Sequence, residues 1–181
     1  MHPDRSAINE VLDPLEMEVF NTDKEELDIT DTDEVLNFGV INRPDVIINC
    51  AAVTDTDLCE KEPELAYRVN ALGARNLSIV ARKTGAKMVQ ISTDDVFDGD
   101  SQVPYTEFDT PNPQTVYGKS KLAGENFVRE FCSRHIIIRS SWIFGAGSPY
   151  LGQILQMAEQ GQVIQADPAQ YAAPTGAEEL A

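Results

Sequence analysis

The chain has 181 residues, of which 14 are Lys or Arg and 30 are Asp or Glu, so its formal net charge is −16 at pH 7. Nucleic acids and anionic membrane surfaces bind basic protein faces, and this charge therefore argues against both as partners. The length fits one domain, and a hydrophobic share of 42% is sufficient for a buried core.

Cysteine and histidine are too few to build a disulfide framework or a metal centre. Cys50, Cys59 and Cys132 form no Cys-x-x-Cys pair, and the chain has only two histidines. The first ten residues contain no apolar run of the kind that signal peptides carry. No apolar run approaches the ~20 residues that a membrane span needs. We therefore expect a soluble, cytoplasmic protein without a bound metal.

Short β-branched runs alternate with longer helical stretches along the chain. Residues 17–21 predict a first strand, and Thr30 or Asp31 is expected to cap a helix that ends near Gly39. The later predicted elements are strand 46–49, helix 62–85, strand 87–92, loop 98–113, helix 115–131, strand 135–139, helix 151–159 and a short strand at 163–164.

This alternation of strands and helices predicts an α/β fold with a mostly parallel sheet and helices on both faces. The strand at Val46–Asn49 is apolar without alternation, as in a strand buried on both sides. Ligands bind such sheets at the carboxyl ends of the strands. The segments after Asn49, Ser92 and Arg139 therefore deserve first consideration as site residues.

Tyr117 and Lys121 lie four residues apart on a predicted helix and so share one face. An ammonium group beside a phenol favours the phenolate and lowers its pKa from the ordinary value of about 10. Such a phenol exchanges a proton with a carbonyl or hydroxyl oxygen. Taken alone, the pair is common and is more typical of a surface tyrosine beside a solvated lysine.

Three further segments lie just after predicted strands. The hydroxyl of Thr93 either faces the cleft or caps a turn. Ala51 and Ala52 either admit a cofactor close to the backbone or simply pack tightly. Trp142, the single tryptophan, lies just past a strand and on its own is more typical of a core residue.

Together these segments resemble the dTDP-4-dehydrorhamnose reductase family, a branch of the extended short-chain dehydrogenase/reductase superfamily. The resemblance covers about residues 7–181 and is carried by the stretches DITDTDEV, RPDVIINCAAVTDTD, ISTDDVFDG, EFDTPNPQTVYGKSKLAGE, RSSWIFG and APTGAEELA. It implies a Rossmann-type fold. The implied reaction is reduction of the C4 ketone of dTDP-4-dehydro-L-rhamnose to dTDP-L-rhamnose, with NADPH or NADH as cofactor.

The resemblance also assigns roles to individual residues. The catalytic residues would be Thr93, Tyr117 and Lys121. The substrate contacts would be Thr93, Asp94 and Trp142. The cofactor contacts would be Asp23, Asp28, Ile29, Ala51, Ala52, Val53, Thr54, Ile91, Tyr117 and Lys121. The implied partners are a dTDP-sugar substrate and, as one compatible assembly, a second copy in a homodimer.

The sequence departs from the family pattern at both ends. The family's first strand and its Gly-rich turn are missing, since no glycine precedes Gly39, and that turn normally holds the pyrophosphate. The family's last elements, which complete the substrate region, are missing too. We therefore expect an incomplete cofactor-binding domain over 1–145 and a partial substrate region over 146–181. Asp95 stands where the family usually has a substrate-contacting tyrosine.

Two alternative functions remain open from the sequence. One is a non-catalytic or fragmentary relative that acts as a binding or regulatory subunit, which the glycine-free start suggests. The other is a different extended short-chain dehydrogenase that acts on another nucleotide sugar.

Overall fold

The computed structural model describes residues 3–12, 16–145, 149–164 and 173–181. The chain divides into two compact units, one formed by Phe20–Arg139 and the other by Met1–Val19 with Ser140–Ala181. The functional boundary expected between residues 145 and 146 stays a prediction.

The unit Phe20–Arg139 contains a three-stranded sheet in the order β1-β2-β3. The strands are β1 (Val46–Asn49), β2 (Lys87–Thr93) and β3 (His135–Ser140). β1 and β2 are parallel, with Val46 opposite Lys87 and Asn49 opposite Gln90. The parallel α/β arrangement predicted from the sequence is confirmed.

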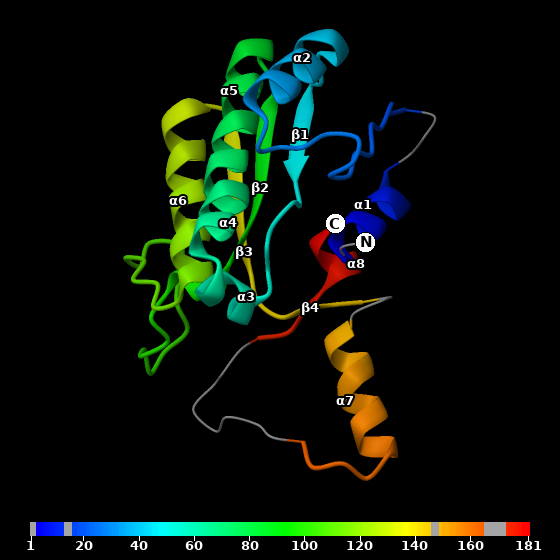
Figure 1. The fold of residues 1–181 in the computed structure, drawn as a ribbon, viewed down its shortest axis with the longest axis vertical. Coiled ribbons are helices and arrows are strands. Elements are labelled where there is room, and N and C mark those ends of the chain that lie inside the picture. The colour runs from blue at the N-terminus through cyan, green and yellow to red at the C-terminus, as the bar shows by residue number, and fades with distance from the viewer. Residues whose placement is uncertain (1–2, 13–15, 146–148, 165–172) are drawn as a thin grey trace. The chain divides into compact units, whose positions relative to one another are not determined.

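Helices form one layer against this sheet (Figure 1). The layer consists of α2 (Thr32–Asn42), α5 (Ala74–Thr84) and α6 (Val116–Phe131), in that order across the sheet. Side chains from all three helices and from β2 build the core, among them Val35, Val80, Met88 and Val128, each at most 2% exposed. The predicted helical cover of the second face stays a prediction.

The helix predicted over 62–85 forms in three consecutive segments. They are α4 (Pro63–Tyr67), the π-helical segment η1 (Arg68–Gly73) and α5. Gly85 ends α5 with a φ of +81°, a conformation that glycine adopts without strain. A further helix, α3 (Thr56–Lys61), precedes α4 and was not predicted. Its signal in the sequence is Asp55, whose carboxylate caps it by accepting from the Leu58 N–H at 2.9 Å.

Two predicted strands do not form. Residues 17–21 and residues 163–164 are described and lie outside helices and strands. A strand is stable only when a neighbour pairs with its backbone, and neither segment has such a ladder in the sheets of the described residues. The prediction of these two strands was wrong for that reason.

The second unit is described by itself and holds short elements. They are α1 (Pro3–Val11), β4 (Ile143–Phe144), α7 (Pro149–Glu159), β5 (Thr175–Gly176) and α8 (Ala177–Leu180). β4 and β5 form a parallel pair in which Ile143 lies opposite Thr175. The helix predicted over 151–159 is confirmed as the main part of α7.

Candidate active site

The start of helix α6 lies against the carboxyl end of β2. Thr115 caps the helix by accepting the N–H of Gly118 at 3.0 Å. A Cβ atom on Gly118 would stand 2.1 Å from the carbonyl oxygen of Asp95, so only glycine allows this close approach. The approach places Tyr117 within hydrogen-bonding range of Thr93, the last residue of β2.

Thr93 is nearly fully buried and already forms local hydrogen bonds. Its hydroxyl accepts the N–H of Asp95 at 3.2 Å and lies 3.3 Å from a carboxylate oxygen of Asp94, to which it donates. The sequence offered two interpretations of this hydroxyl, a turn cap or a group facing the cleft. The structure shows the turn cap, since Thr93 caps the turn η2 (Asp94–Val96). It also shows an interaction of Thr93 with Tyr117, and the cleft-facing role stays a prediction.

Lys121 lies one helical turn after Tyr117 and is buried. Its ammonium group donates to the backbone carbonyl of Ile91 at 2.7 Å. This bond ties α6 to β2 two residues before Thr93. The structure therefore brings Thr93, Tyr117, Lys121 and Ile91 together, and the roles expected for them stay predictions.

The expected lowering of the Tyr117 pKa is wrong in this structure. The pKa of Tyr117 is raised to about 12, chiefly by burial and also by the carboxylates of Asp95 and Asp94, while the hydrogen bond with Thr93 acts to lower it. The Lys121 ammonium donates to the Ile91 carbonyl. Burial has the largest effect on the pKa of the Tyr117 phenol. Tyr117 is therefore a protonated phenol at neutral pH, which is the form that can donate a proton.

The loop after β1 is held in place by Asn70, a residue that the sequence analysis did not select. The Asn70 amide accepts the Val53 N–H at 2.8 Å and donates to the Val53 carbonyl at 3.0 Å. It also lies 2.9 Å from the hydroxyl of Ser120 on α6. A Cβ on Gly124 would stand 2.3 Å from the Asn70 carbonyl oxygen, so α6 packs closely here. The π-helical segment η1, a form found often at functional sites, presents Asn70 to both partners.

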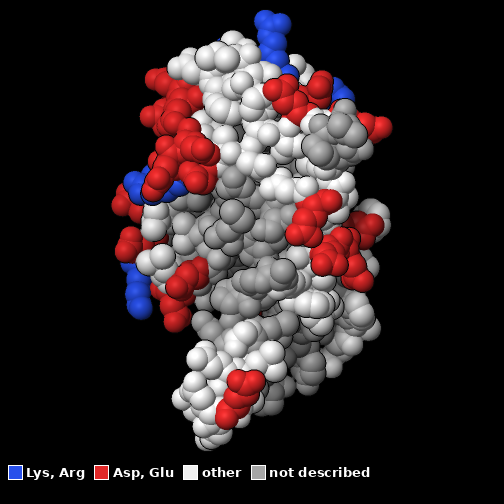
Figure 2. All heavy atoms as spheres, turned by 90° about the vertical axis from the view of Figure 1, so that its right-hand side faces the viewer, with Lys and Arg blue, Asp and Glu red and all other residues white. Residues whose placement is uncertain are grey.

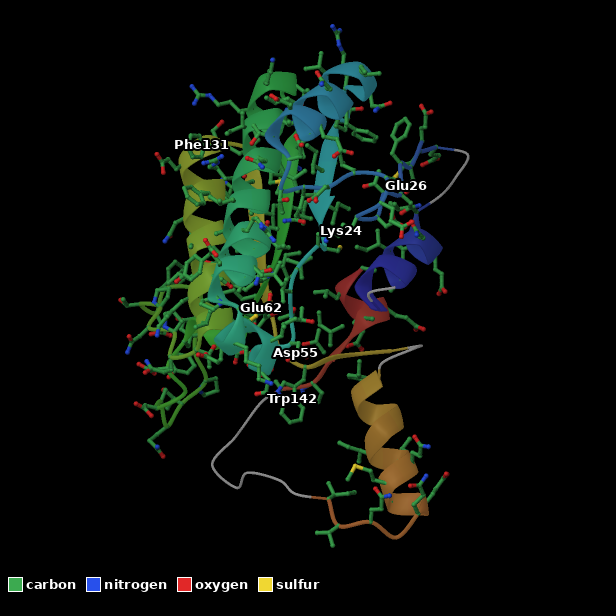
Figure 3. The ribbon with its side chains drawn as sticks, viewed as in Figure 1. Lys24, Glu26, Asp55, Glu62, Phe131 and Trp142 are labelled. Carbon is green, nitrogen blue, oxygen red and sulfur yellow. The ribbon has the colours of Figure 1, made fainter. Side chains whose placement is uncertain are left out.

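The other residues of this loop face solvent to different degrees. Ala51 and Thr54 are exposed, and Ala52 is half-buried. The N–H of Ala51 donates to the Asn49 side chain at 3.1 Å, which turns the chain sharply after β1. Figure 3 marks Asp55 and Glu62, the residues that directly precede α3 and α4 beyond the loop. The loop therefore offers a short stretch of small and exposed residues between two fixed ends.

The residues predicted for the adenosine side lie in local turns. Asp23 accepts the N–H groups of Glu25 and Glu26 at 2.9 Å and 3.2 Å, in the exposed turn where Figure 3 labels Lys24 and Glu26. Asp28 accepts the backbone N–H and the hydroxyl of Thr30 at 2.9 Å and 2.8 Å. These bonds lower the pKa of Asp28.

Ile29 packs at the edge of the core against Gly73, and a side chain larger than that of glycine does not fit at position 73. A Cβ on Gly73 would stand 2.5 Å from the Ile29 side chain. Asn76, which is 2% exposed, donates to the Ile29 carbonyl at 3.0 Å. The segment carrying Asp28 and Ile29 is therefore anchored to α5.

The predicted substrate contacts fall in different units. Asp94 follows Thr93 directly, and Asp95 is exposed beside it. Partial desolvation of the Asp95 carboxyl by the protein atoms around it, followed by the negative charge of Asp94, raises the pKa of Asp95. Trp142 belongs to the other unit, where its carbonyl accepts the Thr175 N–H at 3.3 Å. Its φ is +43°, an uncommon value for an aromatic residue, and its side chain is 45% exposed, so it is no core residue of its unit.

Two absences concern the described residues. No group of three or more His, Cys, Asp or Glu side chains is arranged there to hold a metal ion. None of the helices in the described part of the chain is long and apolar enough to cross a membrane.

Comparison with known proteins gives several relatives that are named dTDP-4-dehydrorhamnose reductase. The chain is 45% identical over 140 residues to a dTDP-4-dehydrorhamnose reductase of Salmonella typhimurium, a match that covers 77% of this chain and 47% of the relative. It is 36% identical over 178 residues to the protein of the same name from Aggregatibacter actinomycetemcomitans, covering 60% of that relative. The chain thus spans about half the length of the curated relatives it matches.

Solved structures agree with this result. A dTDP-4-dehydrorhamnose reductase from Clostridium acetobutylicum superposes with a TM-score of 0.94 at 40% identity, covering 98% of this chain and 63% of that one. A dTDP-4-dehydrorhamnose reductase from Bacillus anthracis, solved in complex with NADP, superposes with a TM-score of 0.93 at 39% identity. This match covers 98% of this chain and 64% of that one. The RmlD substrate binding domain family matches residues 6–181. The chain therefore belongs to the RmlD substrate binding domain family.

Proposed function

We propose that the chain carries out the NAD(P)H-dependent reduction of the C4 ketone of dTDP-4-dehydro-L-rhamnose. The observation that supports this most directly is the meeting of two hydroxyl groups, those of Thr93 and Tyr117, at the carboxyl end of β2. The Lys121 ammonium lies one helical turn beyond them. The names of the full-length relatives supply the substrate class.

The described residues fit the nicotinamide half of a dinucleotide. Lys121 supplies an ammonium group for a ribose hydroxyl, and its link to the Ile91 carbonyl fixes its position. Ala51, Ala52, Val53 and Thr54 form the loop along which the cofactor would lie, held from behind by Asn70. Bound there, NADPH or NADH would supply a hydride to the carbonyl carbon.

The fit at the adenosine half is weaker. Asp23 and Asp28 each have one carboxylate oxygen engaged by the local backbone, so a ribose would bind through the second oxygen. Ile29 lies next to Asp28 and offers an apolar contact for the adenine. We therefore assign Asp23, Asp28 and Ile29 a secondary part in cofactor affinity.

Tyr117 acts as the acid in the proposed reaction. Its phenol is protonated at neutral pH, because burial holds its pKa at about 12. As the carbonyl oxygen gains negative charge, the phenol donates its proton to that oxygen and leaves a phenolate. Thr93 stabilises the same oxygen when its hydroxyl exchanges the bond to Asp94 for one to the substrate.

The sugar nucleotide would also contact Asp94 and Trp142. Asp94 accepts hydrogen bonds from sugar hydroxyls, and the flat, half-exposed indole of Trp142 suits a pyranose ring. On the face drawn in Figure 2, the charged side chains are mainly acidic. An anionic nucleotide therefore gains no general attraction from such a surface and depends on local hydrogen bonds.

A Tyr117→Phe substitution tests this proposal. Phenylalanine keeps the packing of the ring and removes the proton donor, so turnover should fall at least about 100-fold. The decrease in NADPH absorbance with dTDP-4-dehydro-L-rhamnose as substrate measures it, and binding of the sugar nucleotide should change little. Equal turnover by the wild type and the variant would refute the assignment of Tyr117 as the acid.

A second candidate is a binding subunit without catalytic activity. The adenosine side favours it, because the carboxylates of Asp23 and Asp28 already accept local backbone N–H groups. Calorimetric titration of the wild type with NADPH separates the two candidates. Micromolar binding together with turnover of the ketosugar contradicts the non-catalytic subunit, and lack of NADPH binding contradicts the reductase. A panel of other nucleotide-4-ketosugars tests a different substrate.

A further inference from the structure

The strongest polar cluster outside the proposed reaction centre is built on Glu125, whose side chain is fully buried. One oxygen of its carboxylate accepts the Ser92 hydroxyl at 2.6 Å and the Arg139 Nε at 3.0 Å. The other accepts an Nη2 group of Arg139 and one of Arg129, each at 2.8 Å. The carboxylate therefore joins α6 to β2 through Ser92 and to β3 through Arg139.

The place of Glu125 on helix α6 relates this cluster to the site. Tyr117, Lys121 and Glu125 follow each other at intervals of four residues, so they lie along one face of the helix. On β2, Ile91, Ser92 and Thr93 are consecutive. Lys121 bonds to Ile91, Glu125 bonds to Ser92, and Tyr117 interacts with Thr93. Each of the three strand residues thus has its own partner on α6.

A second contact extends this cluster to the segment after the site. The guanidinium of Arg139 lies 5.0 Å from the ring centroid of Phe97, which follows the turn carrying Asp94 and Asp95. The Phe97 ring stacks on Tyr105 at 4.4 Å. Arg139 is only 14% exposed, and its bidentate pair with Glu125 is the geometry in which guanidinium and carboxylate bind most strongly.

A buried carboxylate is costly to place, and its pair with an arginine contributes little to stability compared with apolar residues of similar size. Desolvation raises the pKa of Glu125, but the hydrogen bonds from Arg139, Ser92 and Arg129 outweigh it and lower that pKa overall. The group is therefore ionised at neutral pH. A hydrogen-bonded charged cluster at this position fixes the orientation of α6 and its spacing from β2 more strictly than apolar packing does.

From these contacts we propose that Glu125 and Arg139 are positioning residues for the reduction, which set α6 in register with β2 so that Tyr117 meets Thr93. The proposal rests on the proposed function, because it assigns Tyr117 and Thr93 to the reaction. Neither Glu125 nor Arg139 is expected to touch substrate or cofactor.

Two changes test the proposal at different strengths. Ser92→Ala removes the bond between β2 and Glu125 and leaves the ion pair in place. The double variant Glu125→Leu with Arg139→Met removes both charges together, which avoids an unpaired buried charge and so preserves folding. Ser78→Ala is the matched control, because Ser78 is also buried and its hydroxyl donates within α5, to the Ala74 carbonyl at 2.7 Å.

We expect kcat to fall about 3- to 10-fold in Ser92→Ala and about 10- to 100-fold in the double variant, since small misplacements of reacting groups have effects of this size. The KM for the sugar nucleotide should stay within about twofold, because the ground-state contacts are elsewhere. Ser78→Ala should keep the wild-type kcat. The urea midpoint of each variant shows whether folding is intact.

A second measurement needs no substrate. Alkaline titration of tyrosinate absorbance, with Tyr117→Phe as the blank, gives the pKa of Tyr117, which the structure places at about 12. Loosening of α6 lets water reach the phenol and moves this pKa toward its ordinary value of 10.

The outcomes separate the two proposals. A wild type without turnover contradicts the proposed function, and the titration then decides the positioning role alone. A wild type with turnover, together with a folded double variant that keeps both the wild-type kcat and the wild-type tyrosine pKa, overturns the positioning role. Should the double variant fail to fold, Ser92→Ala decides the question by the same two readouts.

Discussion

Replacing Asn70 by alanine should loosen the loop after β1 and weaken cofactor binding. Asn70 is 3% exposed, and its amide makes three hydrogen bonds, two to the backbone of Val53 and one to Ser120. Each buried polar group left without a partner costs about 1–3 kcal/mol. Val53 is half-buried and partly reached by water, and Ser120 keeps its bond to the Tyr117 carbonyl. We therefore take the low end of this range for each group that loses its partner. The free energy of unfolding should fall by about 2–4 kcal/mol.

Urea unfolding followed by circular dichroism measures that loss, and fluorescence titration with NADPH measures the affinity. Asn112→Ala is the control, since Asn112 is exposed and its amide bonds to Asp98 at 3.0 Å in a surface loop. The control should lose less than about 1 kcal/mol and bind NADPH like the wild type. If Asn70→Ala unfolded at the same urea concentration as the control, the argument that this amide holds the Val53 loop would be refuted.

Two further predictions concern the packing and the protonation of the site. Gly118→Ala should lower turnover about 100-fold and stability by about 1–3 kcal/mol, because the new Cβ meets the Asp95 carbonyl oxygen at 2.1 Å. The control is Gly152→Ala on α7, where a Cβ meets nothing within 4 Å. This control should be neutral or stabilising in the same unfolding assay. The raised pKa of Tyr117 means that the folded state holds this proton more tightly than the unfolded chain. Its contribution to stability is therefore complete below pH 10 and is lost as the pH rises through about 12. Tyr117→Phe should lose less stability than the wild type between these pH values, and equal alkaline losses would contradict the burial of the phenol.

The elements that could be predicted from sequence are those whose local signals agree with their packing. β1 and β2 are apolar runs bounded by turns, and α6 has a capping threonine, Thr115, and an apolar face. The predicted strand at 17–21 had the right composition and no neighbour to pair with in the described sheets. Strand formation depends on a partner that may lie anywhere in the chain, so composition alone is insufficient.

Of the candidate site, the sequence by itself determined the groups to which we assign the proposed chemistry. The spacing of Tyr117 and Lys121 puts them on one helix face, and the position of Thr93 after an apolar strand puts it at the ligand-binding edge of a parallel sheet. The family resemblance, now supported by the relatives, joined these signals into one reaction.

Only the tertiary structure decided the environment of these groups. The pKa of the Tyr117 phenol is raised mainly because the side chain is buried, and desolvation depends on how elements pack around that side chain. Asn70 and Glu125 read in the sequence as ordinary polar residues of helices. Their partners, Val53 and Ser92, lie 17 and 33 residues away, and such long-range hydrogen bonds follow from the fold and leave no local pattern in the sequence.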